Sequence, residues 1–200
     1  MTPKIITEST TEPISLAEAG ENVRAAMDTN SPPAYVEAAR ITKLIKAARQ
    51  ACEEELEISL VAKTLEIAGN SFASVIDLPG GPVRSIVSVK YLDPDGVDTV
   101  LAADQYRFSD YARASVLLLA YGVSWPSART DVDSVRVRYT VGYPSDDSPP
   151  EEVPEPIRQA MHLCIAHWFA NREAVDENAR AELPMGVRYL LGKFRKNMGV

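Results

Sequence analysis

The two histidines and two cysteines are the side chains best suited to bind a metal ion, and their spacing argues against such a site. His162 and His167 are five residues apart, which places them about 140° apart around a helix. Cys164 and His167 share a helix face, but zinc needs two further ligands, and none stands at a suitable spacing. Cys52 and Cys164 each lie within an apolar helical pattern, which predicts reduced, buried thiols. We therefore expect no metal and no cofactor.

Other arrangements that carry chemistry are also missing from the sequence. It contains no Gly-x-Ser-x-Gly, no Gly-x-x-x-x-Gly-Lys-Ser/Thr and no Gly-x-Gly-x-x-Gly. Gly80-Gly81-Pro82 is typical of a turn before a strand, because no helix amino terminus follows it. The carboxylates of Glu53-Glu54-Glu55 fan out by about 100° per residue on a helix and cannot converge on one metal. We interpret them as a solvated face and predict a protein that is not an enzyme.

Charged residues near the end of the chain are the best candidates for contacts with other proteins. No acidic residue follows Glu182, whereas four cations do: Arg188, Lys193, Arg195 and Lys196. This basic segment is either a solvated helix end whose cations suit the helix dipole or a docking element for an acidic partner. Asn171, Arg172 and Glu173 lie near a predicted helix end, where charged groups form ion pairs either within the chain or across a subunit boundary.

Length and charge limit the remaining possibilities. Two hundred residues suffice for one domain that buries roughly 70% of its unfolded surface. No run approaches the ~18 apolar residues of a membrane span, and the first residues lack the apolar core of a signal peptide, so we expect a soluble, unexported protein. The formal charge of -7 opposes a protein that grips DNA through clustered cations.

The first 58 residues are predicted to be helical. Ser15 is a good N-cap with Glu18 three residues on, and apolar residues from Leu16 to Met27 predict a helix of about three turns. Small polar residues and two prolines at 28–33 break it. A longer second helix has an apolar face made of Ile41, Leu44, Ile45, Ala48, Cys52 and Leu56.

Between residues 59 and 143 the apolar period changes from 3.6 to 2, which predicts a β region. Val83, Val87, Val89 and Tyr91 alternate with polar residues, and the turn sequence at 93–96 then predicts a hairpin. Residues 116–121 form an apolar run that predicts a more deeply buried strand. A further strand has apolar residues at Val135, Val137, Tyr139 and Val141. Residues 144–152 are a polar, proline-rich linker.

The last part, residues 153–200, is predicted to be helical with a basic tail. Pro154 and Pro156 set the backbone for a first helical turn, and Glu155 suits the helix dipole. The helix that follows has an apolar stripe made of Ile157, Met161, Cys164, Ile165 and Trp168. The sequence therefore predicts an α+β fold in one domain, residues 1–200: a small helical bundle from both chain ends with an inserted, mostly antiparallel β subdomain.

The order of several segments resembles the head-tail connector proteins of long-tailed bacteriophages, also called adaptor or head-completion proteins. The resemblance spans nearly the whole chain, including the helix at 153–175 and an opening at 11–19. Its shorter signatures are Ser124-Trp125-Pro126, Tyr139-Thr140-Val141-Gly142-Tyr143 and Leu183-Pro184-Met185-Gly186-Val187 with the short helix that follows.

The resemblance implies a structural virion protein that assembles in the host cytoplasm and belongs to the neck of the particle. Such proteins form a dodecameric ring beneath the portal protein, extend the DNA channel, and offer a platform to a tail-side stopper or completion protein. DNA passes without specific binding, and no membrane is involved. By analogy, Arg188, Lys193, Arg195 and Lys196 reach the portal, and Asn171, Arg172 and Glu173 contact a neighbouring subunit. A protein-binding module without a ring, or a small cytoplasmic α+β enzyme, is the alternative.

Overall fold

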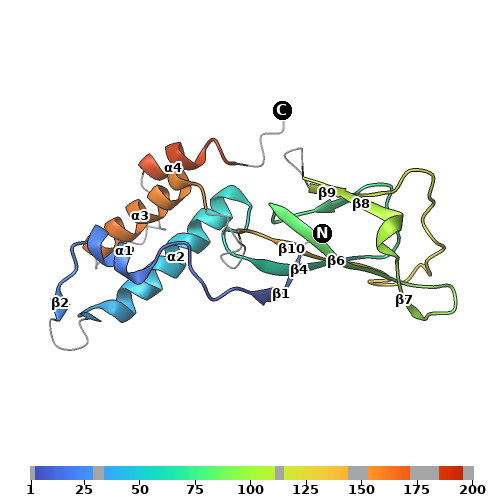
Figure 1. Ribbon diagram of the computed structural model, residues 1–200, viewed down its shortest axis with the longest axis horizontal. Helices are drawn as coiled ribbons and strands as arrows, with labels where there is room; N and C mark the ends of the chain where they lie inside the picture. The colour runs from blue at the N-terminus through green and yellow to red at the C-terminus, as the bar shows by residue number, and fades with distance from the viewer. Residues whose placement is uncertain (1–2, 29–33, 111–114, 144–152, 172–184, 196–200) are drawn as a thin grey trace. The chain divides into compact units, whose positions relative to one another are not determined.

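The computed structural model describes residues 3–28, 34–110, 115–143, 153–171 and 185–195. The chain forms two compact units, one from residues 1–10 and 57–150 and the other from residues 11–56 and 151–198. The first unit holds two antiparallel β-sheets, and the second holds the four α-helices of the described residues (Figure 1). The predicted α+β class, with helices from both chain ends and an inserted β region, is confirmed.

The β unit contains a five-stranded and a three-stranded sheet whose apolar side chains share one core. The larger sheet consists, in spatial order, of β1 (Lys4–Glu8), β4 (Lys63–Gly69), β10 (Val135–Val141), β6 (Val83–Leu92) and β7 (Asp98–Val100). The smaller sheet consists of β5 (Ile76–Leu78), β9 (Ser115–Leu119) and β8 (Tyr106–Ser109), and the 3-10 turn η1 (Ala103–Gln105) precedes β8.

Strand β10 is the central strand of the larger sheet, as its alternating sequence favours. Val135, Val137, Tyr139 and Val141 are all buried, whereas the residues between them are half-buried on the other face. The Tyr139 hydroxyl donates a hydrogen bond to the carbonyl oxygen of Pro79 at 2.8 Å, and burial raises the pKa of that hydroxyl well above its ordinary value. Its polar tip is therefore satisfied inside the core.

Two details of the predicted strands are wrong. Val87 was expected on the apolar face of β6, but it is 53% exposed. The register of β6 against β10 shifts between Ser88 and Ile86, and Val87 falls in the resulting bulge. The predicted strand at 116–121 ends earlier, since β9 stops at Leu119 and Tyr121 is exposed in the turn that follows. The predicted hairpin between β6 and β7 is confirmed.

The prediction of helix throughout residues 1–58 is wrong at its start. Lys4–Glu8 forms the edge strand β1, which pairs with β4, a partner far along the chain. The two-stranded pair of β2 (Met27–Asp28) and β3 (Ala34–Tyr35) also interrupts the helical part. The predicted linker at 144–152 lies outside the described residues.

The helical unit contains α1 (Leu16–Asn22), α2 (Ala38–Leu56), α3 (Glu155–Ala170) and α4 (Met185–Leu191). The predicted capping box is confirmed: the backbone N–H of Glu18 donates to Ser15 Oγ, and the backbone N–H of Ser15 donates to Glu18 Oε2 at 2.8 Å. Helix α1 is shorter than predicted, because the backbone turns to a left-handed conformation at Arg24, where φ is 50°.

The apolar faces of the two long helices form the core of this unit. On α2 the predicted face is buried except for the half-buried Leu44. On α3, Ile157, Met161, Cys164 and Ile165 are buried, and Trp168 is half-buried at the last turn. The stripe predicted for α3 therefore packs inside the bundle, and only its end reaches the surface.

Candidate partner-binding surfaces

Helix α4 places two of the predicted contact residues at the surface. Val187 and Leu191, one turn apart, are fully buried and fix one face of this short helix against the bundle. Arg188 lies on the exposed face, and Tyr189 beside it is 80% exposed. Lys193 is exposed just beyond the helix end. This arrangement presents cations and one aromatic ring on the same surface, a combination suited to an acidic protein partner.

Arg195 is held by the chain itself. Its Nη2 lies 3.2 Å from Glu55 Oε1, and its Nε donates to the Glu55 carbonyl oxygen at 3.2 Å. The guanidinium therefore fixes the segment after α4 against the end of α2, even though the side chain remains 47% exposed. Lys196, the fourth predicted cation, lies outside the described residues.

A hollow of about 670 Å³ lies beside α4, between α2 and the end of α3. Its lining comes from Leu44, Ala47, Gln50, Ala51, Glu54, Glu55, Trp168 and Arg188. It combines an aromatic ring, a guanidinium and two carboxylates around small apolar residues. The hollow can therefore receive an amphipathic segment of a partner, with Trp168 as the apolar anchor.

Asn171, the first of the three predicted intersubunit residues, is used within its own helix. Its Nδ2 donates to the carbonyl oxygen of His167 at 2.9 Å and caps the end of α3. Arg172 and Glu173 lie outside the described residues.

Arg40 on α2 was not predicted to have a role, and it also caps α3. Its Nη2 donates to the carbonyl oxygens of Trp168 and Phe169 at 3.3 and 3.1 Å, and its guanidinium lies 4.8 Å from the centre of the Phe169 ring. A positive charge at this end of α3 is also favoured by the helix dipole. The end of α3 is thereby fixed to α2.

The prediction that Glu53-Glu54-Glu55 forms a solvated face is wrong for two of the three residues. Only Glu54 is exposed. Glu55 holds Arg195, and Glu53 lies 2.9 Å from Nη1 of the buried Arg49. Arg49 also pairs with Glu12 at 2.8 Å. The sequence contains a signal for this cluster, because Arg49 lies on the buried stripe of α2 with a carboxylate four residues on, and a buried cation needs such a partner.

The two cysteines lie together in the core between α2 and α3. Cys52 and Cys164 are free and fully buried, as predicted. A hydrogen bond with Cys164, together with burial, raises the pKa of the Cys52 thiol well above its usual range. In the part of the chain that the structure describes, no three His, Cys, Asp or Glu side chains are grouped so that they can hold a metal ion.

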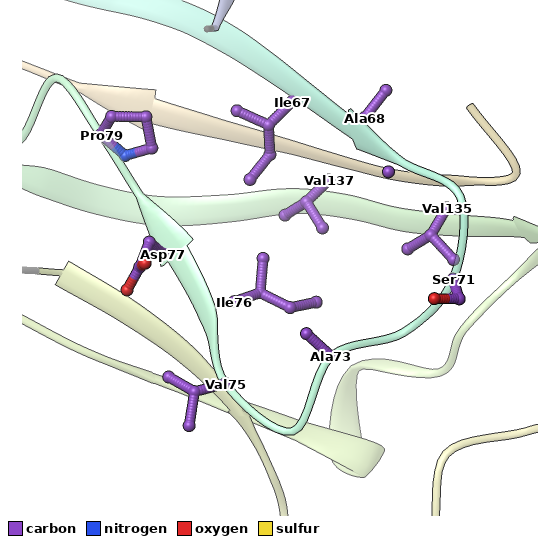
Figure 2. Close-up of a pocket in the computed structure, with 11 residues that line it drawn as sticks. Ile67, Ala68, Ser71, Ala73, Val75, Ile76, Asp77, Pro79, Val135 and Val137 are labelled. Carbon is purple, nitrogen blue, oxygen red and sulfur yellow. The ribbon is translucent and has the colours of Figure 1, made fainter. Parts of the chain in front are cut away.

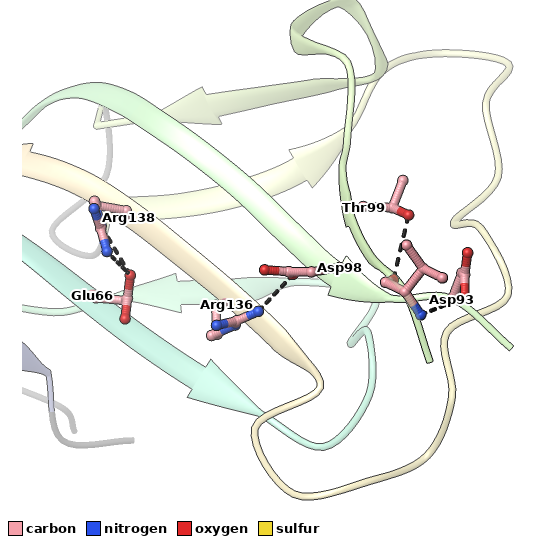
Figure 3. Close-up of polar contacts among 7 residues, drawn as sticks. Glu66, Asp93, Asp98, Thr99, Arg136 and Arg138 are labelled. Atoms are coloured by element: carbon pink, nitrogen blue, oxygen red, sulfur yellow. Dashed lines mark hydrogen bonds and ion pairs between the residues drawn. The ribbon is translucent and has the colours of Figure 1, made fainter. Parts of the chain in front are cut away.

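The outer face of the larger sheet carries ion pairs (Figure 3). Arg138 on β10 donates two hydrogen bonds to Glu66 Oε2 on β4, at 2.9 and 2.7 Å, and Arg136 donates to Asp98 Oδ1 on β7 at 2.6 Å. These pairs tie three of the five strands together on a polar surface. Both guanidinium groups therefore pair with carboxylates of the same sheet, although the buried Nε of Arg136 has no hydrogen-bond partner.

The β unit also contains an apolar pocket of about 260 Å³ (Figure 2). Ile67, Ile76, Val135 and Val137 point into it, Ser71 supplies a polar group, and the exposed side chain of Asp77 points away from it. It lies between β4 and β10 of the larger sheet and β5 of the smaller one. No motif in the sequence pointed to this pocket, since its walls come from segments far apart along the chain.

None of the helices in the described ranges is long and apolar enough to cross a membrane. No protein-family model and no curated protein matches the sequence. Solved structures do match it.

Three of the matching structures are chains of a gene transfer agent (GTA) particle. A chain in the neck of the empty particle, computed with C6 symmetry, has a TM-score of 0.77 at 21% identity, covering 100% of this chain and 98% of that chain. A chain in the virion of the native particle has a TM-score of 0.74 at 22% identity, with the same coverage. A chain in the native neck, computed with C12 symmetry, has a TM-score of 0.70 at 21% identity, covering 98% and 97%. Over its whole length, the chain therefore has the fold of chains from a gene transfer agent particle and its neck, consistent with the resemblance to head-tail connectors.

Proposed function

We propose that this chain is a structural virion protein of the neck, a head-tail connector subunit without enzymatic activity or cofactor. The observation that carries the proposal is the match to neck chains over the full length of both proteins. Signatures in the same order along the sequence support it independently. The assignment of residues 1–200 to a single connector domain is part of this proposal.

The proposed assembly is a closed ring, and we favour a dodecamer. Support comes from the matched necks, which were computed with C6 and C12 symmetry. A ring of identical subunits needs a head-to-tail interface that closes on itself. In this proposal the ring lies beneath the portal protein, extends the DNA channel and provides a docking platform for a tail-side stopper or completion protein.

The segment around α4 is proposed to dock onto the portal. Arg188 and Lys193 are exposed cations that suit acidic groups of a partner, and Arg188 also lines the hollow in which Trp168 offers an apolar contact. Arg195 is proposed to position this segment through Glu55, and Lys196 remains a proposed contact. Exchanging Arg188 and Lys193 for Glu should weaken portal binding by about tenfold or more. The matched control is Lys46→Glu, an exposed cation on α2, which should leave binding unchanged.

Contacts between neighbouring subunits are proposed at Asn171, Arg172 and Glu173. The side chain of Asn171 already caps its own helix. The charged residues Arg172 and Glu173 are therefore the better candidates for a contact with a neighbouring subunit. Arg172→Glu is expected to impair ring formation, whereas Asn171→Ser should mainly loosen the end of α3. Ring assembly that is unchanged by Arg172→Glu would count against this contact.

The net acidic charge suits a channel wall past which DNA slides without specific binding. A charge of -7 repels phosphate, and we propose that acidic side chains line the ring interior. The proposed location is the head-tail interface of the particle, after assembly in the host cytoplasm, and no membrane partner is involved. An interior dominated by Lys and Arg would contradict this view.

Sedimentation velocity of the purified chain, alone and mixed with its portal protein, tests the proposal. The expected result is one discrete oligomer that sediments with the portal. Chains that stay monomeric and ignore the portal would overturn the connector assignment. Binding of single subunits to the portal without a ring would favour the alternative, a protein-binding module.

A further inference from the structure

The apolar pocket of the β unit has the size and chemistry of a site for an aromatic side chain. Its volume is about 260 Å³, and Ile67, Ile76 and Val137 line its interior. A buried apolar cavity of about 150 Å³ is sufficient to bind benzene, so a phenol ring fits here. Ser71, an exposed residue of the lining, is a polar side chain that can hydrogen-bond a hydroxyl at the opening (Figure 2). An amphipathic ring with a polar tip matches this combination.

Tyr121 is such a ring, and it projects from the same unit. It has a relative exposure of 101%, which is the accessibility of a side chain that touches nothing else in the protein. The backbone N–H of Val123 donates to the carbonyl oxygen of Ala120 at 3.3 Å, and Gly122 has a φ of 78°. Tyr121 therefore occupies the second position of a tight turn with glycine at the third. The turn fixes the backbone that carries the ring. Less backbone entropy is therefore lost when the ring is bound.

We infer that Tyr121 of one subunit inserts into the pocket of the next subunit in the ring. Tyr121 is not among the residues that line the pocket of its own chain, so knob and pocket are separate surfaces. A contact between two different surfaces of identical chains is head-to-tail, and its repetition generates a ring when the rotation between subunits closes. The inference rests on the proposed ring and names the contact that builds it.

No pattern in the sequence points to this contact. The apolar run at 116–121 predicted a buried strand, whereas β9 ends at Leu119 and Tyr121 is fully exposed. Tyr189 is also exposed, at 80%, but it lies beside the cations of α4. Tyr121 is preferred because it and the pocket both belong to the β unit, and because a turn rather than a charged helix face presents it.

Ring assembly by matched variants of the full chain tests the contact. Tyr121→Ala removes the knob, and Ala73→Phe places a ring in the mouth of the pocket from an exposed position. Each should raise the protomer concentration for half assembly by about thirtyfold or more, as for an interface hot spot. Tyr121→Phe keeps the ring and should change it by less than about tenfold. Val132→Ala, an exposed apolar residue outside the pocket, should have no effect.

A covalent link between Tyr121→Cys and Val75→Cys tests the same contact at a protomer concentration above the raised threshold for assembly, where rings that lack the tyrosine still form. Val75 is 47% exposed and lines the pocket, and the native Cys52 and Cys164 are fully buried. Mild oxidation should give a ladder of covalent oligomers from the double variant and only heterodimers from a mixture of the two single variants.

The two proposals fail in different ways. If wild-type rings form and Tyr121→Ala assembles at the same concentration, or the double variant forms rings but gives no ladder, the knob contact is wrong and the ring stands. If the wild-type chain forms no ring, alone or with its portal, the proposed function fails and the inference fails with it.

Discussion

The buried guanidinium of Arg49 allows a quantitative prediction about the helical unit. Its side chain is 6% exposed and pairs with Glu12 at 2.8 Å and Glu53 at 2.9 Å, whose side chains are 16% and 11% exposed. Arg49→Met keeps the apolar stem and removes the charge, so that two largely buried carboxylates lose the guanidinium that they share. Removal of one partner from a buried ion pair costs about 3–5 kcal/mol.

This cost is large relative to the stability of a small unit. With a urea slope of about 1.5 kcal/mol/M, a loss of 3–5 kcal/mol lowers the unfolding midpoint by about 2–3 M. Adding Glu12→Gln and Glu53→Gln to Arg49→Met should recover most of the loss, because no unpaired charge then remains. Lys46→Met, an exposed change of the same kind on α2, should shift the midpoint by less than about 0.5 M.

The two tryptophans make the assay specific. Trp168 belongs to α3, and Trp125 belongs to the β unit, where it stacks on Phe72 at 4.5 Å. In a Trp125→Phe background, fluorescence during urea unfolding reports on the helical unit alone. An Arg49→Met midpoint within about 0.5 M of the parent would refute the reasoning that the cluster is an obligatory buried charge network.

Three further predictions concern single sites. Gly142→Ala should destabilise the β unit by about 3 kcal/mol or more in thermal unfolding, because φ is 89° and a Cβ would lie 2.0 Å from a carbonyl oxygen. The control Gly122→Ala, at φ 78° in open space, should cost only about 1 kcal/mol. Equal losses from the two substitutions would contradict this reasoning. Burial lowers the pKa of His162 in the folded protein, so the unfolded state binds more protons and stability falls as the pH drops below about 6.5. His162→Gln should make the free energy of unfolding, measured in urea, depend less on pH. An unchanged dependence on pH would contradict this. Cys52 and Cys164 should resist a thiol reagent at about pH 8 in the native protein and react on unfolding, since both are buried and the pKa of Cys52 is raised; fast native labelling would contradict this.

The elements with a strong local pattern were predictable from the sequence. The alternation along β10 and the apolar stripe of α2 both identified their buried faces, since burial on one face imposes its period on the residues. The capping box at Ser15 was likewise local, because donor and acceptor are three residues apart. In each case the residues that decide the structure belong to one element and lie a few positions apart along the chain.

The features that depend on distant partners were not predictable. Strand β1 carries no clear period of its own and forms by pairing with β4, some sixty residues later, and the bulge at Val87 arises from the register against β10. The pocket and the fully exposed Tyr121 follow from where the strands end and how two sheets face each other. Arg40 was missed because the tertiary fold supplies the carbonyl oxygens that it binds. For Arg49 the tertiary fold supplies only Glu12, whereas Glu53 lies four residues on in the same helix.

Electron microscopy of the purified chain mixed with its portal protein tests the central claim most directly. A connector subunit predicts closed, dodecameric rings stacked coaxially on the portal, with one continuous channel, in line with the C12 symmetry of a matched neck. The image that would contradict the account is a bare portal beside unassembled single chains.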